Sequence, residues 1–334
     1  MIQSTAFRMD RLVPLDRTWI LTGRSMVDQI ERSLPGLPKS RILAEPAARN
    51  TAPCIGWAAA KLLKTDPEAV MIVLPADHVI RPESVFCDTL RFAADLVEES
   101  PDRLVTLGIK PTFPSTSYGY IQRSGPLESP VAEKWEPLTS AYNVVRFHEK
   151  PPLEKAGEFL KTGRFGWNAG IFIWKARTIY ERLKRFEPEI GELLDRLSEK
   201  IGTDDEAPAT DELFPQMKKI SIDYAVMERA ESIVMLEATF SWDDVGTWCS
   251  LDRLYADRKD EADNLAVGAK LLAVDSRNCI VRGSDPEHLF ALLGMEDIVV
   301  VQTADATLLA RKDREESVRD VIELLKEKNW NEYL

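Results

Sequence analysis

The stretch Ala69-Val70-Met71-Ile72-Val73-Leu74-Pro75-Ala76-Asp77-His78 decides the fold class of this chain. Its first six residues are all apolar, as expected of a buried strand that is covered on both faces. The strand then ends in a polar loop at Asp77, and loops of this kind line the ligand crevice of open α/β sheets. The segment therefore predicts an interior strand of an α/β sheet with a candidate site residue at its carboxyl end.

Between residues 41 and 255, short strand-like runs alternate with helical patterns. This alternation predicts an α/β fold with a doubly wound, mostly parallel sheet and helices on both faces. Further strands are predicted at 103–107, 142–148, 170–174 and 232–238. Helices are predicted at 55–63, 85–98, 153–161 and 177–200.

A highly charged segment at residues 256–264, ADRKDEADN, interrupts this alternation and predicts a linker. Short strands are predicted after it, at 268–274, 279–281, 289–293, 298–301 and 307–310, followed by a helix at 315–328. The chain is therefore expected to form two domains, residues 1–257 and a small strand-rich domain at residues 265–334.

The 334 residues include 43 Lys and Arg against 55 Asp and Glu, a net charge of −12. This charge argues against a nucleic acid or an anionic membrane as the main partner, because both are polyanions. The longest apolar runs have the length of strands, so no membrane span is predicted, and residues 1–12 lack the apolar block of a secretory leader. The four cysteines are dispersed, which predicts reduced thiols. A cytoplasmic globular protein is the expectation.

Acidic residues follow two of the predicted strands. Asp77 ends the strand at 69–74, and the pair Asp243-Asp244 follows the strand at 232–238. Carboxylates from separate strand ends can share one Mg²⁺, which typically uses one or two carboxylates together with phosphate oxygens and water. The pattern therefore indicates phosphate chemistry, although a turn or helix-capping role is the commoner explanation of each Asp taken alone.

Residues 45–53, E-P-A-A-R-N-T-A-P, are dense in hydrogen-bonding groups and open the helix predicted at 55–63. Helix N-termini favour anions, and the side chain of Glu45 or Asn50 could read a base edge. The alternative is a loop with a capping Asn or Thr.

Three more segments combine polar groups with strand ends or with glycine: F-H-E-K-P at 147–151, W-N-A-G at 167–170 and T-S-Y-G-Y at 116–120. In the first, Glu149 could accept from hydroxyls while Lys150 binds a phosphate. In the other two, glycine allows a close approach of the backbone to a ligand. A solvated ion pair and ordinary turns are the alternatives.

Seven ordered motifs together resemble one known family. They are E-P-x-x-R-N-T-A-P from Glu45, L-P-A-D-H from Leu74, Y-G-Y-I from Tyr118, F-x-E-K-P from Phe147, W-N-A-G-I-F from Trp167, S-I-D-Y-A-V-M-E from Ser221 and W-D-D-V-G-T-W from Trp242. In this order they closely resemble the mannose-1-phosphate guanylyltransferases, and residues 294–301 resemble the C-terminal domain of that family.

The resemblance implies a nucleotide-diphospho-sugar transferase fold and the reaction of GTP with mannose 1-phosphate to give GDP-mannose and pyrophosphate. It implies that Asp77 and Asp244 hold Mg²⁺ and that Lys150 clamps the sugar phosphate. By motif position, the residues that face the guanine nucleotide are Glu45, Arg49, Asn50 and Thr51. The positions that contact the sugar are Gly119, Glu149, Asn168 and Asp223.

The N-terminus departs from the family pattern. The motif G-G-x-G-T-R-L-x-P, which cradles the triphosphate, has no counterpart in this sequence, and about 30 residues that include the first strand of the sheet are expected to be missing. Either a start placed too far downstream or a truncated gene product explains this pattern. Two alternatives to a guanylyltransferase that makes GDP-mannose stay open. One is a catalytically impaired regulatory homologue that binds nucleotide sugars, and the other is a related sugar-1-phosphate nucleotidyltransferase. The oligomeric state stays open, a homodimer included.

Overall fold

The computed structural model describes residues 1–333. By packing, the chain divides into two compact units, Met1–Trp242 and Asp243–Leu334. This boundary lies before the linker predicted at 256–264. The reason is that Trp248 and Leu251, which precede the linker, pack with Ile280 and Val299 of the C-terminal strands.

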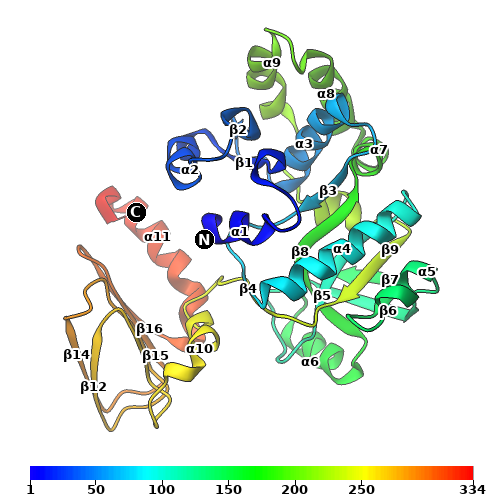
Figure 1. The fold of residues 1–334 in the computed structure, drawn as a ribbon. Coiled ribbons are helices and arrows are strands. Elements are labelled where there is room, and N and C mark those ends of the chain that lie inside the picture. The colour runs from blue at the N-terminus through cyan, green and yellow to red at the C-terminus, as the bar shows by residue number, and fades with distance from the viewer. Residues whose placement is uncertain (334) are drawn as a thin grey trace. The chain divides into compact units, whose positions relative to one another are not determined.

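The first unit is built on a six-stranded sheet (Figure 1). In spatial order its strands are β3 (Val70–Val73), β8 (Phe165–Lys175), β5 (Leu104–Ile109), β9 (Ile233–Glu237), β7 (Ala141–His148) and β6 (Tyr120–Pro126). The apolar run at 69–74 thus forms the predicted strand, and the other four predicted strands are present as β5, β7, β8 and β9.

The pairing of these strands corrects one expectation. Among the described strands of this sheet, β5 and β9 pair in parallel, whereas the other neighbours pair antiparallel. The sheet is therefore mixed rather than mostly parallel. The sequence could not show this, because apolar runs report that a strand is covered on both faces, and a strand in a mixed sheet can be covered in the same way.

Helices cover both faces of the sheet, as the alternation of elements predicts. On one face α3 (Thr51–Thr65), α7 (Ala176–Phe186) and α8 (Pro188–Lys200) pack on Phe172 and Trp174 of β8. On the other face α4 (Glu83–Glu99) and α6 (Leu153–Thr162) pack on side chains of β5 and β8 (Figure 1). The α/β class is thus confirmed.

The helix predicted at 177–200 is broken in two. The break falls at Glu187, whose φ of −130° and ψ of 72° are not helical. Pro188 explains it, because proline lacks a backbone N–H and disfavours helical geometry in the residue before it, yet suits the first position of a new helix.

The N-terminal part of the first unit forms a small layer of its own. It contains α1 (Ile2–Met9), β1 (Ile20–Gly23), α2 (Val27–Ser33) and β2 (Ile42–Glu45). Strands β1 and β2 pair in parallel as a separate two-stranded sheet, with Ile20 opposite Ile42. Leu43 of β2 joins the same buried cluster as α3, which fixes this layer to the unit.

The remaining elements of the first unit are short. They are β4 (Val79–Arg81), α5 (Pro130–Trp135), α9 (Glu206–Leu213), the π-helix η5 (Asp223–Met227) and β10 (Ser241–Asp243), which ends just past the boundary.

The second unit is rich in strands, as predicted. Its four-stranded sheet contains β11 (Leu265–Val267), β13 (Ile280–Arg282), β15 (Ile298–Gln302) and β16 (Thr307–Arg311), and its two-stranded sheet contains β12 (Lys270–Val274) and β14 (Leu289–Leu293). Helix α10 (Ser250–Leu254) precedes them. The predicted terminal helix is the shorter α11 (Val318–Glu327), preceded by a 3-10 turn. In the part of the chain that is described, no helix is long and apolar enough to cross a bilayer.

Candidate active site

The register of three strands brings three predicted site residues to one place. Tyr120 of β6 lies opposite His148 of β7 and also opposite Trp167 of β8. Because both pairings are antiparallel, the residue before Tyr120 lies beside the residues after His148 and Trp167, and a backbone hydrogen bond from Asn168 to Gly119 agrees with this. These three residues, Gly119, Glu149 and Asn168, form one row.

Asn168 connects this row to a fourth predicted residue. Its Nδ2 donates a hydrogen bond of 2.8 Å to Oδ1 of Asp223, the first residue of η5. Its Oδ1 accepts from the backbone N–H of Gly170 at 3.0 Å, and its own N–H donates to the carbonyl of Gly119 at 2.8 Å. The side-chain amide is therefore fixed in orientation, with acceptor and donor roles assigned by its partners.

Carboxylates gather around this amide. Burial raises the pKa of Asp223 above its ordinary value, and burial together with the charge of Asp223 raises the pKa of Glu149. Burial and the charges of these two acids also raise the pKa of Glu228. Nζ of Lys150 lies 3.5 Å from Oε1 of Glu149 and offsets part of this negative charge. Like charges held close at a partly buried place are typical of functional sites.

Gly119 makes room for Glu149. A Cβ atom at position 119 would lie 2.4 Å from Oε2 of Glu149, which is closer than real contacts allow. Glycine at this position therefore lets the carboxylate lie against the backbone. Lys150 follows with a φ of 45°, so the backbone leaves the extended path of β7 here, and the Lys150 side chain is exposed.

The predicted nucleotide motif lies at the start of α3. Glu45 ends β2, and burial raises the pKa of its carboxyl. Asn50 caps α3 by accepting from the N–H of Thr51 at 2.8 Å, and the hydroxyl of Thr51 accepts from the N–H of Ile222 at 2.8 Å. A guanidinium N–H of Arg49 donates to the carbonyl of Pro215. The capping alternative is thus realised in the structure, and the side chains at 49 and 51 attach this motif to the segment that leads to Asp223.

Asp77 lies at the same edge of the sheet as Asn168. Val73 of β3 pairs with Phe172 of β8, so the residues after Val73 run alongside those before Phe172. A Cβ at Gly170 would lie 3.6 Å from the ring of Pro75, which agrees with this path. The carboxylate of Asp77 is exposed, and no hydrogen bond or ion pair to it is found among the described residues.

A row of aromatic rings connects the two places. His78 and Trp242 have ring centroids 5.2 Å apart, Trp242 and Tyr118 5.4 Å, and Tyr118 and Trp167 4.9 Å. Nε1 of Trp242 donates to Nδ1 of His78 at 3.0 Å. The row begins next to Asp77 and ends next to Asn168. In the sequence, the motif that contains Trp242 is notable for its carboxylates, and the sequence does not predict that Trp242 joins this row of aromatic rings.

The two acids of the pair 243–244 differ in their surroundings. Asp243 is 6% exposed and accepts from the N–H of Val245 at 2.8 Å and from Nε of Arg253 at 2.5 Å. Asp244 is half-buried and accepts from the N–H of Gly246 at 3.3 Å. The carboxylate of Asp243 is thus engaged by an ion pair with Arg253.

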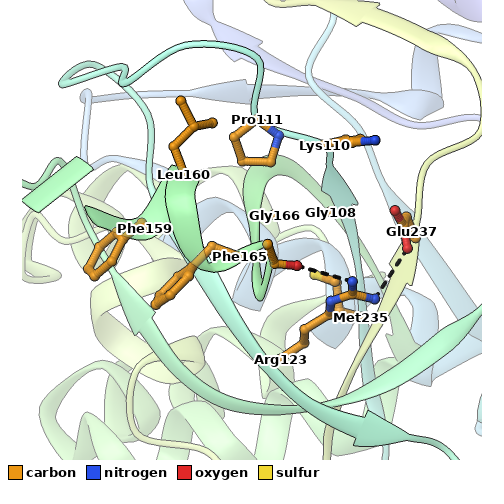
Figure 2. A pocket seen from close by; sticks show the side chains of 11 residues that line it. Gly108, Lys110, Pro111, Arg123, Phe159, Leu160, Phe165, Gly166, Met235 and Glu237 are labelled. Atoms are coloured by element: carbon orange, nitrogen blue, oxygen red, sulfur yellow. Dashed lines mark hydrogen bonds and ion pairs between the residues drawn. The ribbon is translucent and has the colours of Figure 1, made fainter. Parts of the chain in front are cut away.

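One pocket is lined by none of these residues. It has a volume of about 290 Å³ and lies beside Gly108, Gly166 and Met235 (Figure 2). Arg123 donates to the carbonyl of Gly163 at 3.2 Å and to a carboxylate oxygen of Glu237 at 3.3 Å. Figure 2 shows the contact between Arg123 and Glu237. The residues predicted for substrate binding do not line it, so we place the candidate site at the polar row and not at this pocket.

Comparison with known proteins identifies the family. A family profile described as Nucleotidyl transferase matches residues 15–261, and one described as MannoseP isomerase/GMP-like beta-helix domain matches residues 269–325. These matches divide the chain within or next to the charged linker, whereas packing divides it at residue 242. The chain belongs to the nucleotidyl transferase family of enzymes.

Its curated relatives give the finer assignment. Mannose-1-phosphate guanylyltransferase 2 of Escherichia coli O157:H7 is 34% identical over 339 residues, with 100% of this chain and 68% of the relative covered. Xanthan biosynthesis protein XanB of Xanthomonas campestris is 37% identical, with 87% and 58% covered. The chain is a member of the mannose-1-phosphate guanylyltransferase group, and it spans 58% to 68% of the length of these two relatives.

A solved structure agrees with this assignment. The protein described as mannose-1-phosphate geranyltransferase from Thermus thermophilus superposes with a TM-score of 0.82 and is 33% identical, and the match covers 97% of this chain and 89% of that one. The mixed α/β sheet and the strand-rich C-terminal unit are therefore the architecture of this family.

Proposed function

We propose that this chain transfers the guanylyl group of GTP to mannose 1-phosphate, forming GDP-mannose and releasing pyrophosphate. The observation that carries the proposal is the polar row of Gly119, Glu149 and Asn168 with its contact to Asp223. Such a row offers acceptors and donors to sugar hydroxyl groups, and the relatives named above indicate mannose 1-phosphate as the sugar.

Each residue of the row would have a separate task. The carboxylates of Glu149 and Asp223 would accept hydrogen bonds from sugar hydroxyls, and Asn168 would keep Asp223 in place through its 2.8 Å hydrogen bond. Lys150, whose side chain is 63% exposed, would bind the sugar phosphate as a cation. This phosphate oxygen would attack the α-phosphorus of GTP in line while the bond to pyrophosphate breaks, so catalysis consists of positioning and charge neutralisation.

The acidic residues fit a hard cation. The carboxylate of Asp77 is exposed and unengaged within the described residues, and that of Asp244 is half-buried. In the same part of the chain no three His, Cys, Asp or Glu side chains gather as metal ligands, so a cation here would rely on one or two carboxylates and on substrate oxygens, as Mg²⁺ does. We propose that Asp77 and Asp244 hold Mg²⁺, which when bound would neutralise charge on the phosphates.

The segment from Glu45 to Thr51 is proposed to face the guanine nucleotide. Glu45 is the side chain best suited to accept from a base edge, because Arg49 and Thr51 bond to the segment that leads to Asp223. Those bonds would tie the base-reading segment to the sugar-binding row.

Pyrophosphate release by the purified chain with GTP, Mg²⁺ and mannose 1-phosphate tests the proposal, and competition among GTP, ATP and UTP tests the base preference. A pocket that hydrogen-bonds one base edge rejects analogues strongly, so GTP should dominate. Calorimetric binding of GDP-mannose without any turnover would instead support a regulatory nucleotide-sugar-binding role. Turnover with another nucleotide or sugar phosphate would support a related transferase.

A further inference from the structure

Helix α1 contacts the loop of Asp77 at two points. Thr5 Oγ1 donates to the carbonyl of Ala76 at 3.0 Å, and a guanidinium N–H of Arg8 donates to the carbonyl of His78 at 3.2 Å. These two carbonyls belong to the residues on either side of Asp77. Because Thr5 and Arg8 are three residues apart on a helix, their side chains project from the same face.

The surroundings of Arg8 make this contact specific. Arg8 is 5% exposed, and its guanidinium lies 5.7 Å from the ring centroid of Phe86. Nε of Arg8 lies 3.7 Å from a carboxylate oxygen of Glu83. This nitrogen is buried and has no hydrogen-bond partner among the described residues. Burial lowers the pKa of Arg8 below its ordinary value. A buried guanidinium needs acceptors, and the carbonyl of His78 provides one.

We propose that Thr5 and Arg8 are positioning residues that hold the backbone on both sides of Asp77 and thereby aim its carboxylate. The carbonyls on both sides of Asp77 are thus hydrogen-bonded, and the ring of His78 accepts from Trp242, so these contacts restrict the backbone at Asp77. A ligand that is aimed before it binds loses less entropy on binding. We call the two hydrogen bonds from Thr5 and Arg8 the clamp. The use of Asp77 for a cation rests on the proposed function, whereas the clamp does not.

Hydrogen exchange of the backbone amides of residues 76–79 tests the clamp without any ligand. The variants are Thr5→Val and Arg8→Met, with Thr5→Ser and Arg8→Lys as conservative replacements that keep a donor. Gln3→Ala is the matched control on the same helix, because Gln3 donates to the carbonyl of Ser33 and not to the loop. Loss of one hydrogen bond should speed exchange of these amides about fivefold.

We expect this faster exchange in Thr5→Val and Arg8→Met, recovery in the conservative variants and no change at 76–79 in Gln3→Ala. Unchanged exchange, or an equal rise in Gln3→Ala, would overturn the proposal, because α1 would then only support the fold.

A second readout measures the affinity of Mn²⁺ by electron paramagnetic resonance in the presence of GTP. Thr5→Val and Arg8→Met should weaken it about threefold or more, with recovery in Thr5→Ser and Arg8→Lys. If these two variants leave the affinity unchanged while Asp77→Asn weakens it, the clamp does not aim Asp77 and the proposal fails. If Asp77→Asn itself has no effect, the metal assignment of the proposed function fails, and the exchange result still decides the clamp.

Discussion

Asn168 donates a 2.8 Å hydrogen bond to Asp223, and this contact joins the middle of β8 to a π-helix 55 residues further along the chain. The amide and the carboxylate are complementary only when the amide nitrogen faces Asp223. The backbone N–H of Gly170 enforces that orientation by donating to the amide oxygen. The pair is therefore sensitive to small changes in charge and size.

Asn168→Asp should destabilise the protein and weaken binding of mannose 1-phosphate. The new carboxylate would face Asp223 at hydrogen-bond distance, and like charges at this separation repel unless one is protonated. We expect a loss of about 2 kcal/mol in the free energy of unfolding at pH 8 and a smaller loss at pH 5. Urea unfolding at both pH values measures it. An equal loss at both would contradict the electrostatic explanation.

Asp223→Asn should raise stability at neutral pH while it weakens sugar binding. The folded protein holds the pKa of Asp223 above its unfolded value, so this group costs stability as the pH rises through the window between the two values. Removing the charge should add about 1 kcal/mol at pH 7 and almost nothing below about pH 3, where the acid is protonated in both states.

The same variant should change the pH dependence of sugar binding. Without the charge of Asp223, the raised pKa of Glu149 should fall, so the pH below which the KM for mannose 1-phosphate rises should move downward. Asp204→Asn, which removes an equal charge at an exposed position, is the control. A control that shifts the profile as much would point to net charge alone.

Gly119→Ala should raise the KM for mannose 1-phosphate about tenfold, a change of about 1.4 kcal/mol in binding. The added methyl group would meet Oε2 of Glu149 and displace that carboxylate. Gly125→Ala is the matched control, because Gly125 lies on β6, the strand that begins directly after Gly119, and its Cβ would meet nothing within 4 Å. Steady-state kinetics of both variants measures the effect. Equal KM values in the two variants would show that the close approach at 119 has no role in binding.

Asp77→Asn and Asp243→Asn should separate function from stability. Asp77 carries no described partner, so its neutral variant should keep its melting temperature and lose the dependence of activity on Mg²⁺ concentration. Asp243 holds Arg253 and the N–H of Val245, so its variant should lose about 1 to 3 kcal/mol of stability. Thermal unfolding with a Mg²⁺ titration measures both. If Asp243→Asn kept its stability and lost the Mg²⁺ dependence while Asp77→Asn lost stability, the metal would be assigned to Asp243.

Much of this site could be predicted from short segments. The apolar run at 69–74 indicates β3, and the positions 119, 149, 168 and 223 come from motifs that the structure brings together. Strand direction could not be predicted, because the side-chain pattern of β8 is the same in either direction. The partners of Thr5 and Arg8 could not be predicted either, because their acceptors are backbone carbonyls about 70 residues away and carry no side-chain signature.

The sequence by itself determined which segments are buried and which polar residues interrupt them, because side-chain hydropathy and proline or glycine chemistry act locally. It thereby determined the α/β class, and the resemblance of its ordered motifs to a known family indicated the family. Only the tertiary structure decided that one register row carries Gly119, Glu149 and Asn168 and that an N-terminal helix holds the loop of Asp77. Backbone pairing over long separations sets these relationships, and the identity of a residue places little constraint on which distant peptide group it meets.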